Sequence, residues 1–390
     1  MHYDADILII GGGLVGTALA AALAKSTHSI LLLEGRTPQT QAPSERWDNR
    51  VYAISRASQR LLSDIGAWQR LDAARIQPVS RMQITGDDGR STLAFDALDA
   101  GLDALTTILE SGNLQAALWQ TAMAAPNVSV MAPAEPAAFA YDDDGVTVTL
   151  ADGRSIRARL AVGADGANSW LRNGAGIDSS SKPYGQWGVV ANFETELPHY
   201  GVARQWFFDD GILAWLPLAG KRISIVWSCD EARKDELLAL PTAELDAKVA
   251  AAGGRALGEL RCITPAAAFP LRLTHVRELV RAGVALVGDA AHTVHPLAGQ
   301  GVNLGFGDVA ELARVLAAAD STKLGDYLTL RRYERARREA IYVMQGACDG
   351  LQKLFNNRNP LLKTLRNTGL GLTDSLPWIK QQLIRHAMDA

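Results

Sequence analysis

Short apolar runs recur along the chain, each bounded by polar or glycine-containing connections. The first, at residues 7–10, enters a glycine-rich loop, and an alanine-rich helix and a second apolar strand ending at Glu34 follow. This order predicts a βαβ unit. Gly11 allows a sharp turn, Gly13 leaves room for a pyrophosphate against bare backbone, and Gly16 lets the helix pack close to the strand. The helix start favours an anion, and a carboxylate at Glu34 accepts hydrogen bonds from a ribose. The stretch therefore predicts a dinucleotide site and leaves open which dinucleotide binds.

Further patterns predict the surrounding elements. Helical spacing of apolar residues predicts a helix over residues 58–74, and alternation around an Asp-Asp-Gly turn predicts a hairpin over 79–100. Another helix is expected to begin near Asn113. Short apolar runs predict strands at 128–131, 137–141, 146–150 and 158–162.

Two later segments add candidate ligand-binding groups at strand ends. The strand at 158–162 leads into a Gly-Ala-Asp-Gly turn, where Asp165 offers a carboxylate before a helix capped by Asn168 or Ser169. The apolar run at 284–287 leads into Gly-Asp, where Asp289 can accept hydrogen bonds from polyol hydroxyls.

The residues after Asp289 predict stabilisation of negative charge. Gly299 and Gly301 permit close approach of backbone N–H groups, and a helix beginning near Val302 adds a positive dipole end. A flavin carries a polyol and becomes anionic on reduction, whereas a nicotinamide does neither, so this segment favours FAD. His292 and His295 lie in the same loop without a fourth ligand nearby, so no metal site is expected.

Residues 184–229 are strand-rich and predict an antiparallel sheet that covers the flavin and forms a wall of a substrate pocket. Four tryptophans in this sheet are candidates for lining an apolar cavity, with plain core packing as the alternative. They are Trp187, Trp206, Trp215 and Trp227.

Composition narrows the function classes. A chain of 390 residues suits two domains or one large one. A net charge of −3 without basic-aromatic interleaving makes nucleic acid an unlikely partner. The three cysteines are widely spaced and predict neither a disulfide framework nor a thiolate metal site. No signal peptide and no membrane-spanning run is expected, so the predicted location is cytoplasmic or peripheral to the inner membrane.

The three ligand-binding segments together resemble the class A flavin-dependent aromatic hydroxylases, the group that contains para-hydroxybenzoate hydroxylase. The glycine loop with Glu34, the segment at 163–166 and the Gly-Asp-Ala-Ala-His segment at 288–292 stand in that family's order. Residues 48–55, 292–305 and 331–334 resemble the ubiquinone-biosynthesis hydroxylases more specifically.

The resemblance implies an α/β fold: a Rossmann-like, glutathione-reductase-type FAD-binding domain, an inserted antiparallel substrate sheet and a C-terminal helical region. The expected FAD-binding domain comprises 1–75, 113–183 and 276–340, the substrate domain 76–112 and 184–275, and the helical region 341–390.

The resemblance also implies a function and a set of site residues. The expected function is hydroxylation of the aromatic ring of a polyprenylated phenol in ubiquinone biosynthesis, through a flavin C4a-hydroperoxide, with O2 and NAD(P)H or another reductant. In such enzymes the residue matching Arg50 lies near the flavin and the residue matching Gln115 touches FAD. The expected catalytic residues are Arg50, Gly299, Gly301 and Val302. The expected cofactor-binding residues are Gly11, Gly13, Gly16, Glu34, Arg50, Gln115, Asp165, Asp289, Gly299, Gly301, Val302 and Asn303. His292 and His295 are candidates for a general base, with a structural role as the alternative.

The C-terminal part carries a cluster of arginines between 331 and 338, followed by amphipathic segments. Such segments bind anionic membranes, dock on their own domain, or associate with other ubiquinone-biosynthesis proteins or a second copy of the chain. Alternatives to the lipid hydroxylase are the same chemistry on a soluble aromatic, an NAD-linked dehydrogenase, and a binding or assembly subunit that holds FAD for structure.

Overall fold

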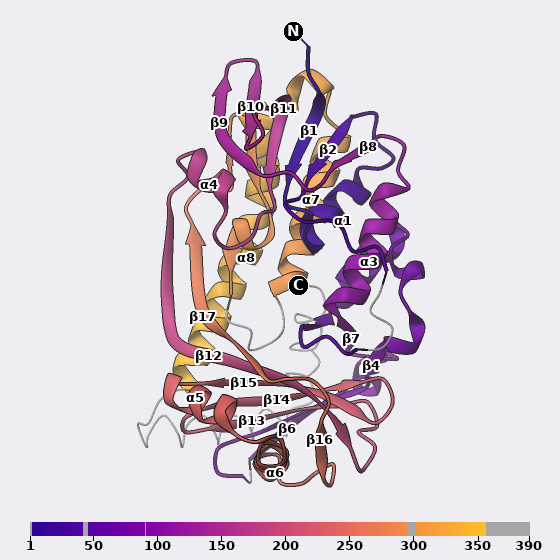
Figure 1. The fold of residues 1–390 in the computed structure, drawn as a ribbon, viewed down its shortest axis with the longest axis vertical. Coiled ribbons are helices and arrows are strands. Elements are labelled where there is room, and N and C mark those ends of the chain that lie inside the picture. Colours follow the sequence, from indigo (N-terminus) through magenta and orange to yellow (C-terminus); the bar gives the residue numbers. More distant parts are fainter. Residues whose placement is uncertain (1, 42–45, 90, 295–300, 356–390) are drawn as a thin grey trace.

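The computed structural model describes residues 2–41, 46–89, 91–294 and 301–355. A mostly parallel sheet forms the upper layer in Figure 1. Its strands follow the order β18 (Val280–Arg281), β19 (Val284–Leu286), β11 (Ser155–Gly163), β1 (Ala5–Ile10), β2 (Ile30–Leu33) and β8 (Val128–Met131). From β19 to β8, neighbouring strands pair in parallel. Buried side chains of these strands form the main hydrophobic core, as expected for parallel strands that are covered on both faces.

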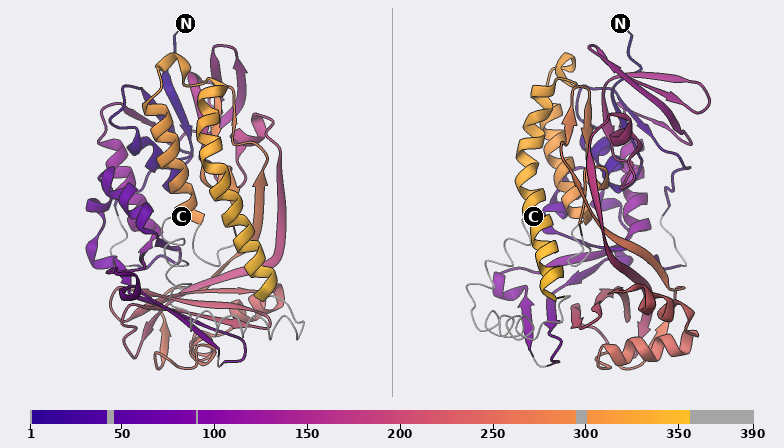
Figure 2. Two further views of the ribbon diagram at one scale, coloured as in Figure 1. Left: turned by 180° about the vertical axis from the view of Figure 1, so that it is seen from behind. Right: turned by 90° about the vertical axis from the view of Figure 1, so that its left-hand side faces the viewer.

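Helices and a hairpin complete this cofactor layer. Helix α1 (Leu14–Ala22) contacts both α3 (Ser111–Met123) and α7 (Gly301–Ala317), and α8 (Tyr327–Phe355) packs along α7. The hairpin of β9 (Pro136–Asp142) and β10 (Gly145–Leu150) pairs with β11. Figure 2 shows α7 and α8 side by side, away from this hairpin.

A second, mainly antiparallel sheet forms the lower layer in Figure 1. Its strands follow the order β20 (His292–Thr293), β17 (Ala267–Val276), β12 (Ser179–Thr195), β15 (Arg222–Cys229), β14 (Gly211–Leu218), β13 (Val202–Phe208), β5 (Arg81–Thr85) and β6 (Thr92–Asp96). Strand β16 (Leu260–Cys262) pairs with β12, and helices α5 (Glu231–Ala239) and α6 (Thr242–Ala252) cover one face of the sheet.

A small sheet of β3 (Val51–Ile54), β7 (Thr106–Glu110) and β4 (Gln77–Val79) lies between the two layers. Side chains from β3, β4 and β7 pack with residues of the second sheet in a separate core cluster. The small sheet therefore joins the layers and leads directly into α3.

The strands of the first half and the hairpin at 79–100 are found where they are predicted. The predicted helix over residues 58–74 is shorter than expected. Helix α2 (Arg56–Asp64) ends before Gly66, which adopts φ +82°. A residue at positive φ stops the helical path of the chain. Short 3₁₀ turns, η1 (Trp68–Arg70) and η2 (Ala73–Arg75), follow.

The four tryptophans lie on the face of the second sheet that α5 and α6 cover, and not on the face toward the cofactor layer. Trp215 and Trp227 belong to the core under these helices, and Trp206 packs against it. Trp187 shares its strand face with the buried Val189, and Lys234 Nζ of α5 lies 4.3 Å from the centre of its ring. The alternation of side chains along a strand does not determine which face of the sheet is covered, and here α5 and α6 cover the face that carries the tryptophans.

Four of the expected domain boundaries fall inside continuous elements. The chain passes from 112 to 113 within α3, from 183 to 184 within β12, from 275 to 276 within β17 and from 340 to 341 within α8. Long strands β12 and β17 run from the upper layer into the lower one (Figure 1). The two layers are therefore linked by paired strands, and residues 356–390 of the predicted helical region lie outside the described residues.

Candidate cofactor-binding site

Four predicted ligand-binding segments follow four adjacent parallel strands. The glycine loop follows β1, Glu34 follows β2, Asp165 follows β11 and Asp289 follows β19. The carboxyl ends of parallel strands meet at one edge of a sheet, and ligands bind in the crevice outside that edge. The topology thus brings together segments that are far apart in the sequence.

The glycine loop has the geometry that a pyrophosphate requires. Gly11 adopts φ +105°, and a Cβ there would lie 2.5 Å from the Ala164 carbonyl oxygen. A Cβ on Gly16 would lie 1.9 Å from the Gly11 carbonyl oxygen, so helix and strand are in backbone contact. A Cβ on Gly13 would meet no atom within 4 Å, at the point where α1 begins. Gly11 and Gly16 therefore serve the fold, whereas Gly13 leaves open space for a ligand at the helix start.

Glu34 and Gln115 support the loop from the sides. Glu34 Oε2 accepts the Gly12 N–H at 2.7 Å. Gln115 Nε2 donates to the Gly12 carbonyl oxygen at 3.0 Å. The ring of Trp119, buried in α3, lies so close below Gly12 that a Cβ there would come within 2.4 Å of it. Trp119 was not among the predicted site residues, because a buried helix residue gives no local signal of the loop that it packs against.

Asp165 is engaged within its own turn. Its Oδ1 accepts the Ser169 hydroxyl at 2.5 Å, and its Oδ2 accepts the Leu171 N–H at 3.0 Å. Ser169 is the N-cap residue of α4 (Trp170–Gly174). Asp165 therefore shapes the turn, and the backbone of the turn is what this segment offers a ligand.

Arg172 links this turn to the segment after β19. It is buried, and its Nη1 donates to the Ala290 carbonyl oxygen while its Nη2 donates to the Ala167 carbonyl oxygen, each at 3.0 Å. Burial lowers the pKa of Arg172. The side chain holds two of the predicted segments at a fixed spacing.

Asp289 is held at a tight turn and can be reached by a ligand. The preceding Gly288 adopts φ +60°, and a Cβ on it would lie 3.0 Å from a methyl group of Val15 in α1. The Asp289 side chain is solvent-exposed, yet enough protein surrounds it to raise the pKa of its carboxyl, against the opposing charges of His292 and Arg50. A polar ligand that donates hydrogen bonds would compensate this cost.

A buried carboxylate behind Asp289 fixes the turn. Asp308 of α7 is fully buried, and its Oδ2 accepts the Gly288 N–H at 3.0 Å and lies 2.6 Å from His292 Nε2. Its Oδ1 accepts Arg337 Nε–H of α8 at 2.9 Å. Burial tends to raise the pKa of Asp308, but the charges and hydrogen bonds of His292 and Arg337 hold it below its ordinary value.

This network gives His292 a structural role. Its ring is 2% exposed and its Nε2 faces Asp308, so the structure favours the structural alternative over a general base. His295 and Gly299 lie outside the described residues.

Helix α7 begins at Gly301, as predicted, and Val302 and Asn303 occupy its first turn. The Asn303 side chain is buried and binds the end of β3: its Oδ1 accepts the Ser55 N–H at 2.9 Å and its Nδ2 donates to the Ala53 carbonyl oxygen at 2.8 Å. This contact fixes the helix start, so any cofactor contact of Asn303 is left to its backbone.

Arg50 lies near the side chains of Tyr52 and Asp289. Its side chain is exposed. Burial raises the pKa of Tyr52, while the charge of Arg50 opposes this rise and the charge of Asp289 adds to it. The three side chains thus share one local electrostatic field, which links β3 to the turn after β19.

Among the described residues, no group of three His, Cys, Asp or Glu side chains is arranged to hold a metal ion. Within the same residues, every helix is too short or too polar to cross a bilayer.

Comparison with known proteins connects this site to a family. A family model described as an FAD binding domain matches residues 4–345. The 3-demethoxyubiquinol 3-hydroxylase of Escherichia coli (strain K12) is 38% identical over 387 residues, which cover 98% of each chain. Ubiquinone hydroxylase UbiL of Rhodospirillum rubrum is also 38% identical, over 98% of this chain and 89% of that protein. The mitochondrial ubiquinone biosynthesis monooxygenase COQ6 of Homo sapiens is 34% identical over 98% and 92%.

Solved structures share the fold. The p-nitrophenol 4-monooxygenase PnpA of Pseudomonas putida has a TM-score of 0.80 at 19% identity, covering 100% of this chain and 99% of that one. PqsL of Pseudomonas aeruginosa, a probable FAD-dependent monooxygenase, has a TM-score of 0.78 at 23% identity, covering 94% and 99%. These structures confirm the predicted α/β flavoprotein fold. The family model and the relatives in sequence confirm FAD as the cofactor, and the chain belongs to the family of FAD-dependent hydroxylases that includes the ubiquinone-biosynthesis enzymes.

Proposed function

We propose that this FAD-dependent monooxygenase hydroxylates the aromatic ring of a polyprenylated phenol in ubiquinone biosynthesis. The observation that carries the proposal is the meeting of the glycine loop, the segment at 163–166 and the Asp289 turn at one sheet edge, in a chain whose full-length relatives are ubiquinone hydroxylases. The substrate class comes from the names of those relatives.

The proposed site residues divide by task. Gly11, Gly13 and Gly16 form the pyrophosphate loop at the start of α1, and Gln115 supports it. Glu34, whose two oxygens accept the Gly12 and Arg36 N–H groups, is proposed to accept a further hydrogen bond from the ribose. Asp289 accepts hydrogen bonds from the ribityl chain, and the Asp165 turn contributes backbone groups.

The start of α7 serves the flavin ring. The backbone from Gly301 to Asn303 and the positive end of this 17-residue helix favour negative charge on the ring, and Gly299 is proposed to contribute to the same role. Arg50, whose charge acts on Asp289, is proposed to act near the flavin. FAD supplies two-electron reduction and activation of O2 when bound, and the residues of the chain bind it, orient it and exclude water.

The reductant and the location are further parts of the proposal. NAD(P)H is the proposed reductant and would bind the FAD-loaded chain only transiently. The chain works at the surface of the inner membrane, where a prenylated substrate dissolves.

Several arginines of the cluster between 331 and 338 form ion pairs within the chain. Arg331 and Arg338 pair with Glu334, and Arg337 pairs with Asp308. Arg332 and Arg335 are exposed on α8 and remain the basic residues of this cluster that can face anionic lipid. The proposal for the membrane surface therefore rests mainly on the substrate.

A spectrum and an oxygen-uptake assay test the proposal. The purified chain is expected to show oxidised flavin bands, and NAD(P)H-dependent oxygen uptake is expected to rise with a polyprenylphenol. A chain that stays colourless after incubation with FAD contradicts it. Equal stimulation by the phenol without its prenyl chain supports the soluble-aromatic alternative.

A further inference from the structure

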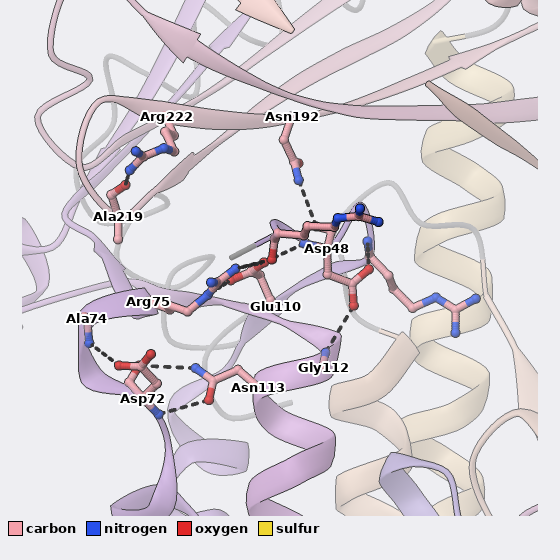
Figure 3. Close-up of polar contacts among 12 residues, drawn as sticks. Asp48, Asp72, Ala74, Arg75, Glu110, Gly112, Asn113, Asn192, Ala219 and Arg222 are labelled. Atoms are coloured by element: carbon pink, nitrogen blue, oxygen red, sulfur yellow. Dashed lines mark hydrogen bonds and ion pairs between the residues drawn. The ribbon is translucent and has the colours of Figure 1, made fainter. Parts of the chain in front are cut away.

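The segment that carries Arg50 is held by polar groups from both layers (Figure 3). Asp48 Oδ1 accepts the Arg50 N–H at 2.9 Å, and Asp48 Oδ2 accepts the Gly112 N–H at 3.1 Å, in the first turn of α3. Asn192 of β12 donates to the Asp48 carbonyl oxygen at 2.9 Å. Asp48 thus joins the start of a cofactor-layer helix, the backbone of Arg50 and a strand of the lower sheet.

A buried ion pair lies behind Asp48 (Figure 3). Glu110 is 2% exposed, and its Oε1 accepts the Asp48 N–H at 2.6 Å. Arg75 binds the same carboxylate in a bidentate manner, with Nε 2.6 Å from Oε2 and Nη2 2.8 Å from Oε1. A planar guanidinium in this geometry fixes the direction of a carboxylate. Glu110 also stands at the N-cap position of α3.

The residues on either side of Asp48 are anchored as well. Arg75 Nη2 donates to the Arg46 carbonyl oxygen at 2.8 Å. Two guanidinium groups lie near the Trp47 ring, with Arg75 Cζ 4.3 Å and Arg222 Cζ 5.0 Å from its centre. The contact with Arg222 attaches the segment to β15 of the lower sheet.

Asn49 completes the attachment to the lower sheet. Its Nδ2 donates to the Pro265 carbonyl oxygen at 2.6 Å, and its Oδ1 accepts the Thr264 hydroxyl. The same hydroxyl oxygen accepts the Asn192 N–H at 2.8 Å. Asp48 and Asn49 therefore attach the segment to α3 and to the lower sheet, whereas the exposed Arg50 interacts with Tyr52 and Asp289.

We propose that Asp48, Glu110 and Arg75 are positioning residues that set the direction of Arg50. Through them, the position of Arg50 depends on how the lower sheet packs against the cofactor layer. The inference rests on the proposed function, because the role of Arg50 near the flavin is itself proposed. A shift of the lower sheet would reach Arg50 through Asp48, which Asn192 holds, and through Asn49, which Thr264 and Pro265 hold.

A double-mutant cycle between Glu110→Gln and Arg50→Ala tests the proposal. The readouts are the dissociation constant of FAD, measured by titrating the FAD-free chain, and the ratio of hydroxylated product to O2 consumed. Each single variant is expected to weaken FAD binding about tenfold relative to the wild type. The double variant is also expected to bind FAD only about tenfold more weakly than the wild type, because the effects of residues that act through one another do not add as free energies. A double variant weakened about a hundredfold overturns the proposal, since independent effects multiply.

Two further variants separate positioning from stability. Glu334 is a buried carboxylate that pairs with Arg331 and Arg338, away from the Asp48 segment. Glu334→Gln is expected to lower thermal stability. Its effect on the dissociation constant of FAD and that of Arg50→Ala are expected to multiply in the double variant, as for independent residues. Arg75→Lys keeps the charge but not the bidentate geometry, so its cycle with Arg50→Ala is expected to show intermediate coupling. If Glu110→Gln fails to fold, Asp48→Asn replaces it in the same cycle with the same expected and contradicting results.

The wild-type chain distinguishes the two failures. If the wild type binds FAD and hydroxylates a polyprenylphenol, but the effects of Glu110→Gln and Arg50→Ala on FAD binding multiply fully, this inference alone is overturned. A wild type that binds no FAD contradicts the proposed function itself.

Discussion

Replacing Asp308 by Asn removes the buried negative charge behind the Asp289 turn. Three groups face its carboxylate: Gly288 N–H at 3.0 Å, His292 Nε2 at 2.6 Å and Arg337 Nε–H at 2.9 Å. An asparagine presents one oxygen and one NH2 group, so in either orientation the NH2 group faces a backbone or guanidinium donor. The Arg337 side chain, 15% exposed, then loses its carboxylate partner.

The structure sets the size of the effect. Breaking a buried ion pair by removing one partner costs about 3–5 kcal/mol. With about 2.1 cal/mol/K of unfolding entropy per residue, the 390 residues give about 0.8 kcal/mol/K. Asp308→Asn is therefore expected to lower Tm by about 4–6 °C. FAD affinity is also expected to fall, because the Gly288 N–H is the group that fixes the turn before Asp289.

Differential scanning calorimetry of the FAD-free chain measures the first effect, and FAD titration measures the second. Glu311→Gln is the matched control, since Glu311 lies on the same helix and pairs with Arg314, whose side chain is 66% exposed. Exposed pairs contribute about 0–1 kcal/mol, so the control is expected to shift Tm by about 1 °C or less. If Asp308→Asn shifts Tm no more than Glu311→Gln, the assignment of a stabilising buried charge is wrong.

Three further predictions concern the glycine loop, the Asp289 turn and the aromatic core. Gly13→Ala is expected to weaken FAD binding tenfold or more, by about 1.4 kcal/mol, and to leave the Tm of the FAD-free chain unchanged, because its Cβ enters the open space proposed for the ligand. Gly16→Ala, whose Cβ would lie 1.9 Å from a carbonyl oxygen, is expected to destabilise the FAD-free chain as well. Calorimetry of the FAD-free chain separates the two variants. Asp289→Asn is expected to stabilise the FAD-free chain at neutral pH and to weaken FAD binding. The raised pKa of Asp289 means that its ionised form is disfavoured by folding, so the gain should vanish as pH falls through that pKa; a Tm below wild type at pH 7 would contradict this sign. Trp215→Ala is expected to cost about 3–5 kcal/mol of stability with an unchanged KM for substrate, whereas a raised KM in the folded variant would return Trp215 to the pocket.

The sequence predicted the features that depend on local order. Gly11, Gly13 and Gly16 lie where the βαβ pattern put them, and the strand before each acidic residue could be recognised from its apolar run. These signals are contiguous in the chain. The fold class followed, because the three segments occur together in one order.

The sequence could not give the partners of buried charges. Glu110 and Asp308 lie in a strand and a helix without any pattern around them, and their partners come from other elements. Asp165 looked like a ligand-binding carboxylate, but its oxygens bind its own turn. Alternation along the strands likewise predicts that the tryptophans share one face of the sheet, but it does not show which face the helices cover.

Isotope-labelled oxygen tests the central claim most directly. The chain, loaded with FAD and supplied with NAD(P)H and a polyprenylphenol under ¹⁸O2, is expected to yield a product that carries one labelled oxygen atom on its ring. A product without label, or flavin turnover that yields only hydrogen peroxide while the phenol is unchanged, would contradict the assignment of this site as a ring hydroxylase.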